Sequence, residues 1–271
     1  MATLTVSVTH DFSGDTLSAI GLIDFVNPAS PATATFASSQ FDNSKILTTV
    51  TIDGSVAINQ IVVTGGSVNG STWTFTNWLA TDLVSLTGGG SADAITGSSQ
   101  KDTITGGLGA DTMAGGDGDD TFVYNSSNEF AAGETINGGA GTGDVLRVNI
   151  GQGFFLPFNV EGLLSNVEAV IFAQAGALQL LGSVVGTGLG QVNSVTGSAG
   201  INQLLIDASQ ADLTGVAFGN WTAGEDQITF LGTGGDDVLV GSSQSDLFFY
   251  SSGRDDLSGG GGDDTFKISQ G

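Results

Sequence analysis

Aspartate recurs at nine-residue intervals in two stretches of the sequence, each time close to glycine. The residues are Asp93, Asp102, Asp111 and Asp120 in the first stretch and Asp237, Asp246, Asp255 and Asp264 in the second. Carboxylates held at a fixed spacing beside glycine-rich turns can bind a hard cation, because such turns also expose backbone carbonyl oxygens. Calcium takes about 6–8 oxygen ligands, whereas magnesium demands tighter octahedral geometry and keeps its waters. The pattern therefore predicts calcium sites.

Each of these aspartates is the sixth residue of a nonapeptide whose eighth residue is apolar. From Gly88 the chain reads GGGSADAIT, GSSQKDTIT, GGLGADTMA and GGDGDDTFV, and from Gly232 it reads GTGGDDVLV, GSSQSDLFF, YSSGRDDLS and GGGGDDTFK. The first six residues of a block can turn sharply, and the last three can form a short strand around one inward apolar side chain. Two blocks make one coil, and coils stack about 4.8 Å apart through parallel ladders. Stacking places like charges in rows, which a bound cation would stabilise.

The blocks GGLGADTMA and GGDGDDTFV closely resemble the RTX nonapeptide GGxGxDxUx, in which U is a large apolar residue. The resemblance implies a right-handed parallel β-roll with calcium between its turns. It also implies secretion in an unfolded state through a type I channel, followed by folding in extracellular calcium. The predicted metal ligands are Asp93, Asp102, Gly106, Gly107, Gly109, Asp111, Gly115, Gly116, Asp117, Gly118, Asp120, Gly234, Asp237, Asp246, Asp255, Gly259, Gly260, Gly262 and Asp264.

Some blocks depart from this motif. GSSQKDTIT and GSSQSDLFF lack most of the turn glycines, and YSSGRDDLS places Arg254 beside its aspartate. We expect these three blocks to bind weakly or only to shape the coil. After Val123 the first array is interrupted and resumes with EFAAGETIN and GGAGTGDVL, in which Glu134 takes the aspartate position and Asp144 stands one residue late. Weaker or absent ion binding is predicted there.

A larger repeat of 143 residues encloses the nonapeptides. The segment INQIVV at 58–63 recurs as INQLLI at 201–206, and Asn77-Trp78 recurs as Asn220-Trp221. Each copy has an apolar part followed by a nonapeptide array. The predicted division is an apolar part at 1–87, an array at 88–147, a second apolar part at 148–231 and a second array at 232–271.

The apolar parts are predicted to form strands. Segments such as ILTTVTID, NQIVVTG and STWTFTNW are rich in β-branched and aromatic residues, with approximate two-residue alternation. Residues 163–173 are also expected to be a strand and not a helix. The predicted fold is therefore an all-β solenoid, in which each apolar part forms wider coils stacked on its own β-roll. We expect the last coil to be open to a continuation of the chain or to a neighbouring molecule.

Charge and composition limit the kinds of partner and the cellular location that we expect for this protein. The chain carries 28 acidic residues against 5 Lys and Arg, a net charge of −23, which disfavours nucleic acid and anionic lipid. It has no cysteine, no apolar run long enough for a membrane helix, and no basic segment followed by an apolar run at its start. We expect a secreted or cell-surface protein exported by a type I pathway without an N-terminal signal peptide.

Catalysis has little support in the sequence, so we expect no enzyme. His10 is the only histidine and is expected at the surface, while Trp78 and Trp221 are expected to pack in the repeat core. The leading prediction is an extracellular calcium-binding structural repeat of an adhesin, surface layer or fibre, which folds on binding calcium. The alternative is a non-catalytic secretion and folding module of a larger enzyme or toxin. A lectin-like surface on the apolar parts is a third possibility. Calcium is the expected partner, with possible self-association end to end or along the solenoid edges.

Overall fold

The computed structural model describes every residue except 27–29, 152–154, 159–162, 189, 251 and 269–271. The described residues form two compact units: Met1–Val123 with Ala131–Gly141, and Tyr124–Phe130 with Thr142–Gly271. Their regular structure consists of short strands and three turns of 3-10 helix, η1 (Ser38–Gln40), η2 (Ser127–Glu129) and η3 (Gly182–Val184). Within this described part, no helix is long and apolar enough to cross a membrane.

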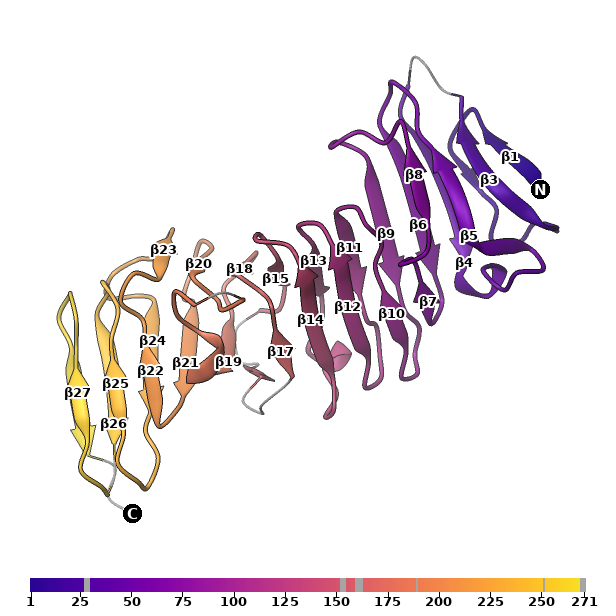
Figure 1. The fold of residues 1–271 in the computed structure, drawn as a ribbon. Helices are drawn as coiled ribbons and strands as arrows, with labels where there is room; N and C mark the ends of the chain where they lie inside the picture. The colour runs from indigo at the N-terminus through magenta and orange to yellow at the C-terminus, as the bar shows by residue number, and fades with distance from the viewer. Residues whose placement is uncertain (27–29, 152–154, 159–162, 189, 251, 269–271) are drawn as a thin grey trace. The chain divides into compact units, whose positions relative to one another are not determined.

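The first unit contains three sheets of parallel strands. Within each sheet, the strands are arranged in the order in which they occur along the chain (Figure 1). The first sheet has the order β1 (Ala2–Val6), β3 (Ile20–Phe25), β5 (Ile46–Asp53) and β8 (Thr74–Thr76). The second has the order β2 (His10–Asp11), β4 (Ala32–Ala37), β6 (Asn59–Thr64), β9 (Leu83–Thr87), β11 (Asp102–Thr105) and β13 (Thr121–Tyr124). The third has the order β7 (Val68–Asn69), β10 (Ala94–Thr96), β12 (Thr112–Asp117) and β14 (Thr135–Ala140).

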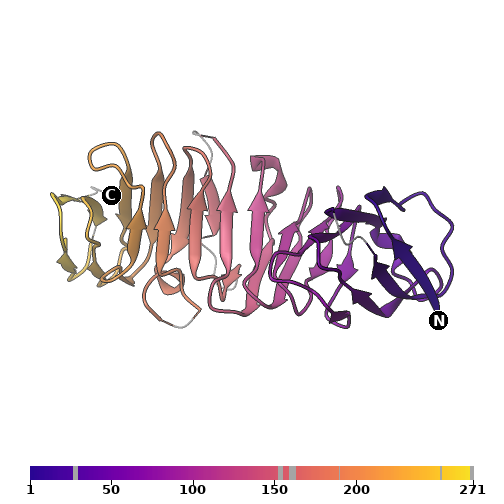
Figure 2. The same ribbon diagram turned by 90° about the horizontal axis from the view of Figure 1, so that it is seen from above.

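The second unit is built in the same way (Figure 2). One sheet has the order β15 (Val145–Val148), β18 (Ala169–Phe172), β20 (Ser194–Thr196) and β23 (Ala217–Gly219). Another has the order β16 (Phe155–Phe158), β19 (Ala177–Leu181), β21 (Gln203–Asp207), β24 (Gln227–Leu231), β26 (Asp246–Tyr250) and β28 (Thr265–Ile268). A third has the order β22 (Gln210–Asp212), β25 (Val238–Val240) and β27 (Asp256–Ser258), and β17 (Leu164–Ser165) also lies in this unit.

The coils have two widths, and both widths share one sheet. Ile61 of β6 pairs with Val84 of β9, whereas Ile104 of β11 pairs with Phe122 of β13, only 18 residues on. Because β9 pairs with both β6 and β11, the wide coils of the apolar part continue directly into the narrow coils of the array. The predicted all-β solenoid is therefore confirmed, including the wide coils stacked on their own roll. Residues 163–173 form β17 and β18, as expected for strands.

The eighth-position side chains form the core of the first array. Ile95, Ile104, Met113 and Phe122 are each at most 2% exposed. Their burial follows from the two-residue alternation of a strand, which turns every second side chain into the coil. The apolar parts bury their alternating residues in the same way, as Ile61 of β6 illustrates.

The repeated tryptophans lie at the edge of the core. Trp78 and Trp221 are half-buried, and each contacts a ring of the buried core, Phe25 or Phe172, so they pack against the core without being enclosed by it. Each contacts the ring of the phenylalanine three residues earlier, Phe75 or Phe218, at centroid distances of 5.1 and 5.3 Å. The fully packed tryptophan of the first apolar part is Trp73.

The 143-residue repeat is visible in the backbone. Asn77 and Asn220, the residues before the paired tryptophans, both have a left-handed φ, of 51° and 50°. Ala19 and Asn166, which lie 147 residues apart in the similar segments LSAI (17–20) and LSNV (164–167), share a φ of 50°. Non-glycine residues rarely adopt this conformation, so its recurrence shows that the two copies share the local backbone conformation at these turns.

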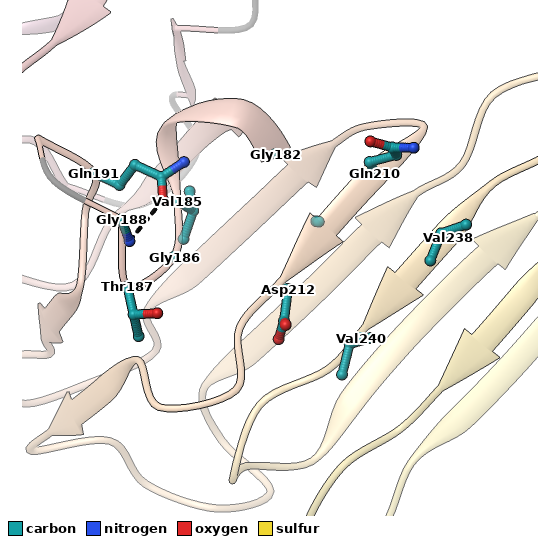
Figure 3. Close-up of a pocket in the computed structure, with 11 residues that line it drawn as sticks. Gly182, Val185, Gly186, Thr187, Gly188, Gln191, Gln210, Asp212, Val238 and Val240 are labelled. Atoms are coloured by element: carbon teal, nitrogen blue, oxygen red, sulfur yellow. Dashed lines mark hydrogen bonds between the residues drawn. The ribbon is translucent and has the colours of Figure 1, made fainter.

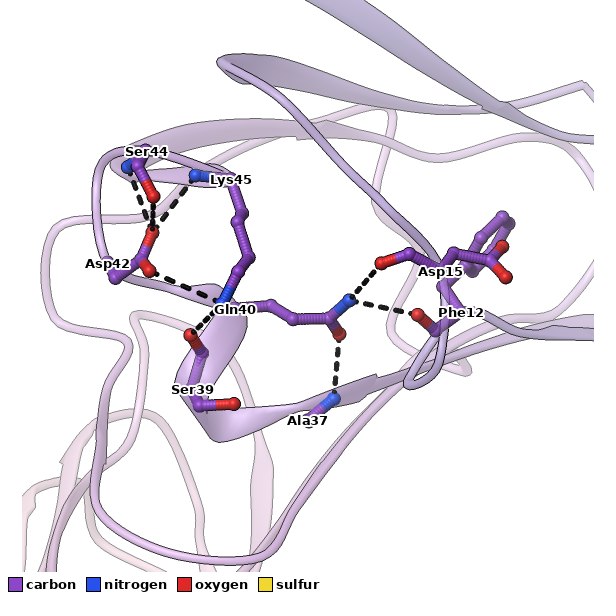
Figure 4. A network of polar contacts seen from close by, with 8 residues as sticks. All are labelled: Phe12, Asp15, Ala37, Ser39, Gln40, Asp42, Ser44 and Lys45. Atoms are coloured by element: carbon purple, nitrogen blue, oxygen red, sulfur yellow. Dashed lines mark hydrogen bonds and ion pairs between the residues drawn. The ribbon is translucent and has the colours of Figure 1, made fainter.

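A buried glutamine closes the loops at the start of the first unit (Figure 4). The Nε2 atom of Gln40 donates to the carbonyl oxygens of Phe12 and Asp15, at 2.9 and 3.4 Å, and its Oε1 atom accepts from the Ala37 N–H at 2.9 Å. Beside it, backbone hydrogen bonds from Lys45 and Ser44 and the Ser44 hydroxyl hold the pKa of Asp42 well below its usual range. These loops are thus fixed by protein groups alone.

Candidate metal centre

The sixth-position aspartates stack in four pairs, each joined by the same hydrogen bond. The backbone N–H of Asp93 donates to Oδ1 of Asp111, 18 residues on, at 2.8 Å. The same bond joins Asp102 to Asp120 at 2.8 Å, Asp237 to Asp255 at 3.1 Å, and Asp246 to Asp264 at 3.0 Å. The structure therefore brings the eight sixth-position aspartates together in pairs between successive coils.

In the first coil of each array, a serine donates hydrogen bonds to the sixth-position aspartate of its own turn. The backbone N–H of Ser98 donates to Oδ2 of Asp102 at 2.7 Å, and the Ser98 hydroxyl donates to the same oxygen at 3.1 Å. Ser242 makes the equivalent bonds to Asp246 in the second array. These serines belong to the two GSSQ blocks, so a hydroxyl occupies the place where the motif has a second glycine.

The second coil of the first array turns differently. Gly107, Gly109, Gly116 and Gly118 have φ between 96° and 119°, which only glycine adopts without strain. In this coil Oδ2 of Asp111 is buried and has no hydrogen-bond partner among the described residues, and the same holds for Oδ1 of Asp102 in the coil before. A buried carboxylate oxygen without a donor is costly, and a bound cation would satisfy it.

Carboxylate and carbonyl oxygens converge beside the first glycine of several blocks. A β-carbon added at Gly115 would collide with Oδ2 of Asp120 and the carbonyl oxygen of Gly138. A β-carbon added at Gly97 would lie 2.8 Å from Oδ2 of Asp102 and would collide with the Gly115 carbonyl oxygen. Such mixed oxygen groups, drawn from two successive coils, are of the kind that calcium binds.

Burial and like charge both raise the pKa of these carboxyl groups. Burial, with the neighbouring charge of Asp120, raises the pKa of Asp102 to about 8 against the opposing hydrogen bonds from Ser98. Burial raises the pKa of Asp246 to about 7, with a smaller contribution from Asp264, and burial together with Asp93 raises the pKa of Asp111. Without a cation, ionising these groups is therefore unfavourable.

The donor set fits calcium better than a transition metal. Within the described residues, no three His, Cys, Asp or Glu side chains converge on one point, so a cation must also bind backbone carbonyl oxygens. His10, the only histidine, is exposed and lies 3.1 Å from the Asp15 carboxylate. Oxygen-only coordination that includes carbonyls is typical of calcium, whereas zinc prefers nitrogen and sulfur.

The remaining predicted ligands differ in exposure and in the groups that they contact. Asp117 is exposed, and the carbonyl oxygen of Gly234 accepts a hydrogen bond from the Ser252 hydroxyl at 3.0 Å. The other predicted turn glycines, Gly106, Gly259, Gly260 and Gly262, lie against the carboxylate or backbone atoms of the same coil or the neighbouring coil. Ser251 of the YSSGRDDLS block lies outside the described residues.

The degenerate blocks also bury their acids. Glu134 and Asp144 are fully buried, and the Asp144 N–H donates to Oε2 of Glu168 at 2.9 Å. Glu168 was missed by the nonapeptide pattern because it lies 24 residues from Asp144 and not 18. Its position directly before β18 is the only signal that could have found it.

A groove of about 460 Å³ lies in the second unit (Figure 3). Its polar groups include Gln191, whose Oε1 atom accepts from the Gly188 N–H, and Gln210 and Asp212 of β22. Val238 and Val240 of the paired strand β25 line it beside Gln210 and Asp212. Among the described residues that line it, Asp212 alone is titratable, and one of its oxygens accepts from the Thr214 N–H. The groove therefore does not combine an acid with a base.

Alanine substitutions should separate the two kinds of coil. We expect Asp111→Ala and Asp120→Ala each to weaken calcium binding on the order of tenfold more than Asp102→Ala does. The blocks of Asp111 and Asp120 keep the turn glycines with left-handed φ, whose backbone oxygens can share the ion, whereas Ser98 replaces a glycine in the Asp102 block. Titration calorimetry measures the three affinities, with the exposed Asp119→Ala as a charge control. Equal losses at the three sites would show that the turn glycines do not determine the quality of a site.

Stability should depend on pH in opposite directions with and without calcium. The folded pKa of Asp102 and Asp246 is raised from 3.8 to about 8 and about 7, so the calcium-free fold is favoured at low pH. Its stability should fall as the pH rises from about 4 to 8. Calcium binds the ionised carboxylates, so in saturating calcium the stability should instead rise with pH. Thermal unfolding followed by circular dichroism at pH 4.5 and 8 tests both signs, and a calcium-free midpoint that rises with pH would contradict them.

Comparison with known proteins agrees with this geometry. The RTX calcium-binding nonapeptide repeat family matches the chain at residues 87–122 and 231–266, which nearly coincide with the eight regular nonapeptide blocks of the two arrays. No curated protein and no solved structure is similar enough to the chain to count as a match. The chain therefore carries RTX repeats, and these repeats bind Ca²⁺.

Proposed function

We propose that this chain, with its two arrays of calcium-binding RTX repeats, is an extracellular structural segment that folds on binding calcium. The observation that carries the proposal is the pairing of buried sixth-position carboxylates between successive coils, as in Asp102 and Asp120. Each pair opposes folding until a cation lies between its oxygens. A chain built almost wholly of stacked coils is suited to serve as a structural segment of an adhesin, a surface layer or a fibre.

The place of folding follows from the affinity expected for such sites. Extracellular calcium modules have a Kd of roughly 0.1–1 mM, so they bind calcium far more weakly than cytosolic buffers do. A chain with a net charge of −23 and buried acids would stay expanded where calcium is scarce. Export in an unfolded state through a type I channel, followed by folding outside the cell, is part of the proposal.

Non-catalytic action is also part of the proposal. The described groove holds one titratable group, and the buried acids of the arrays, such as Asp102 and Asp120, lie in the repeat register, where ion binding is the simpler role. Self-association is proposed through β28, whose Phe266 and Ile268 are 44% and 65% exposed. A further coil of the same chain or a second copy would cover these side chains.

The alternative is a secretion and folding module within a larger enzyme or toxin. The presence of RTX repeats alone favours both readings equally, whereas the wide apolar coils that recur with each array favour a structural role. The full-length gene product separates them: further 143-residue copies support the structural role, and a catalytic domain supports the module.

A mechanical measurement tests the structural role directly. The chain is stretched between two handles by atomic force microscopy, first in calcium and then in excess chelator. A load-bearing segment should resist extension in calcium and should lengthen at much lower force after chelation. Extension of the arrays at the same low force in both conditions would overturn the proposal.

A further inference from the structure

Two turns outside the arrays have the nonapeptide form with asparagine in place of aspartate. The sequence reads GSVAINQIV from Gly54 and GSAGINQLL from Gly197, with Asn59 and Asn202 at the sixth position. Both asparagines are fully buried. Both lie outside the segments that match the RTX repeat family.

The side-chain amide of Asn59 joins two successive coils. Its Nδ2 atom donates to the Ala57 carbonyl oxygen at 2.8 Å, to that of Ser55 at 3.4 Å, and to Oδ2 of Asp82 in the next coil at 3.1 Å. Its Oδ1 atom accepts from the Ser55 hydroxyl at 2.9 Å. Three acceptors around Nδ2 and one donor at Oδ1 fix the orientation of the amide.

The second unit repeats this arrangement. Nδ2 of Asn202 donates to the carbonyl oxygens of Gly200 and Ser198, at 2.9 and 3.2 Å, and to Oδ1 of Asp226 at 2.9 Å. The Ser198 hydroxyl and N–H both donate to Oδ1 of Asn202, at 3.1 and 3.2 Å. Asn202 and Asp226 are both buried.

These turns otherwise match those of the arrays. The Asn59 N–H donates to Oδ1 of Asp82 at 2.8 Å, just as the Asp93 N–H donates to Oδ1 of Asp111 at 2.8 Å. The difference lies in the side chains that face each other. The arrays place two carboxylates together, whereas here an amide donor meets the carboxylate and the turn carbonyls.

We infer that Asn59 and Asn202 take the place of a calcium ion, so that the coil before each array folds without calcium and templates it. We call the turns at 54–59 and 197–202 the locked turns. In the first unit Asn59 begins β6, which pairs with β9, and β9 pairs with the array strand β11. In the second unit Asn202 directly precedes β21, which pairs with β24, and β24 pairs with the array strand β26.

A template matters because coils are stabilised mainly by their neighbours. In a solenoid, each repeat gains much of its stability from the interface with the adjacent repeat, so folding can start in one place and propagate. The locked turns give each array a formed edge, and calcium then adds coils to it in order. The inference rests on the calcium dependence of the arrays proposed above.

Hydrogen exchange of the full chain in excess chelator tests the inference. Peptides that cover β6, β9, β21 and β24 should stay protected, whereas those that cover β12, β13 and β27 should exchange fast and regain protection in calcium. Fast exchange at β6 and β21 in chelator would overturn the inference that the locked turns fold without calcium. Protection of the arrays in chelator would instead overturn the calcium-dependent folding on which the inference rests.

A substitution tests the amide itself. Asn59→Asp replaces the donor with a second carboxylate, so protection of β6 in chelator should fall about tenfold or more, and calcium should restore it. Asn69→Asp is the matched control, because exposed Asn69 only accepts hydrogen bonds from Ser71, which a carboxylate can still accept. Asn202→Asp repeats the test in the second unit, should Asn59→Asp fail to fold in calcium. Unchanged protection of β6 and β21 in both variants would overturn the role of the amides.

Discussion

Removal of calcium is expected to unfold both nonapeptide arrays. Excess chelator should remove part of the β signal in circular dichroism and increase the radius measured by small-angle scattering. The cause is the stacking of buried carboxylates, such as Asp102 on Asp120, whose ionised forms are unfavourable once no cation lies between them. Magnesium at the same concentration should not restore the fold, because it binds irregular oxygen sites poorly.

The control for this experiment is ionic strength. Added monovalent salt screens exposed charges but reaches buried pairs poorly, so it should restore little of the lost signal. Recovery in calcium should be complete and should depend on calcium concentration. An unchanged spectrum and radius in excess chelator would show that the carboxylate rows are stable without an ion.

A methyl group added at one array glycine, Gly115, is expected to weaken a calcium site strongly. In Gly115→Ala the new β-carbon would collide with Oδ2 of Asp120 and the Gly138 carbonyl oxygen. We expect calcium affinity to fall by about tenfold or more, together with a loss of stability on the order of 1–3 kcal/mol from overpacking. Titration calorimetry and thermal unfolding in saturating calcium measure the two effects.

The matched control is Gly90→Ala in the same array. A β-carbon at Gly90 meets no atom within 4 Å, and neither Gly90 nor Gly115 has a left-handed φ. The two variants therefore change backbone freedom equally and differ only in what the added methyl group contacts. Similar calcium affinities for both would mean that the oxygens around Gly115 do not hold the ion.

The sequence predicted the arrays well because their period is constant. A fixed nine-residue register determines which side chain enters the coil and which aspartate follows another after 18 residues, as Asp102 and Asp120 show. Register alone could not show which carboxylate oxygens are already satisfied. That depends on the φ of the turn, which Ser98 and Gly116 set differently at equivalent second positions.

The sequence was less informative where the coil width changes. Glu168 stacks on Asp144 after 24 residues, and Asp82 stacks on Asn59 after 23, so neither pair falls in the nonapeptide register. The wider coils absorb extra residues in loops of variable length, and pairing across them can be found only in space. The sequence did not show that Trp78 is only half-buried, because a loop residue at the edge of a coil does not follow strand alternation.

A stack of three aromatic rings runs from the last strand of the second apolar part into the second array. Phe230, Phe248 and Phe266 stack one above another, with ring centroids 4.5 and 4.7 Å apart and planes inclined by only 5° and 12°. Aromatic rings held at this distance in a fixed, chiral arrangement couple electronically and give near-ultraviolet circular dichroism. Because Phe248 and Phe266 belong to successive array coils, this coupling exists only while those coils are in register. Assembly of the second array can therefore be followed in real time without an attached dye.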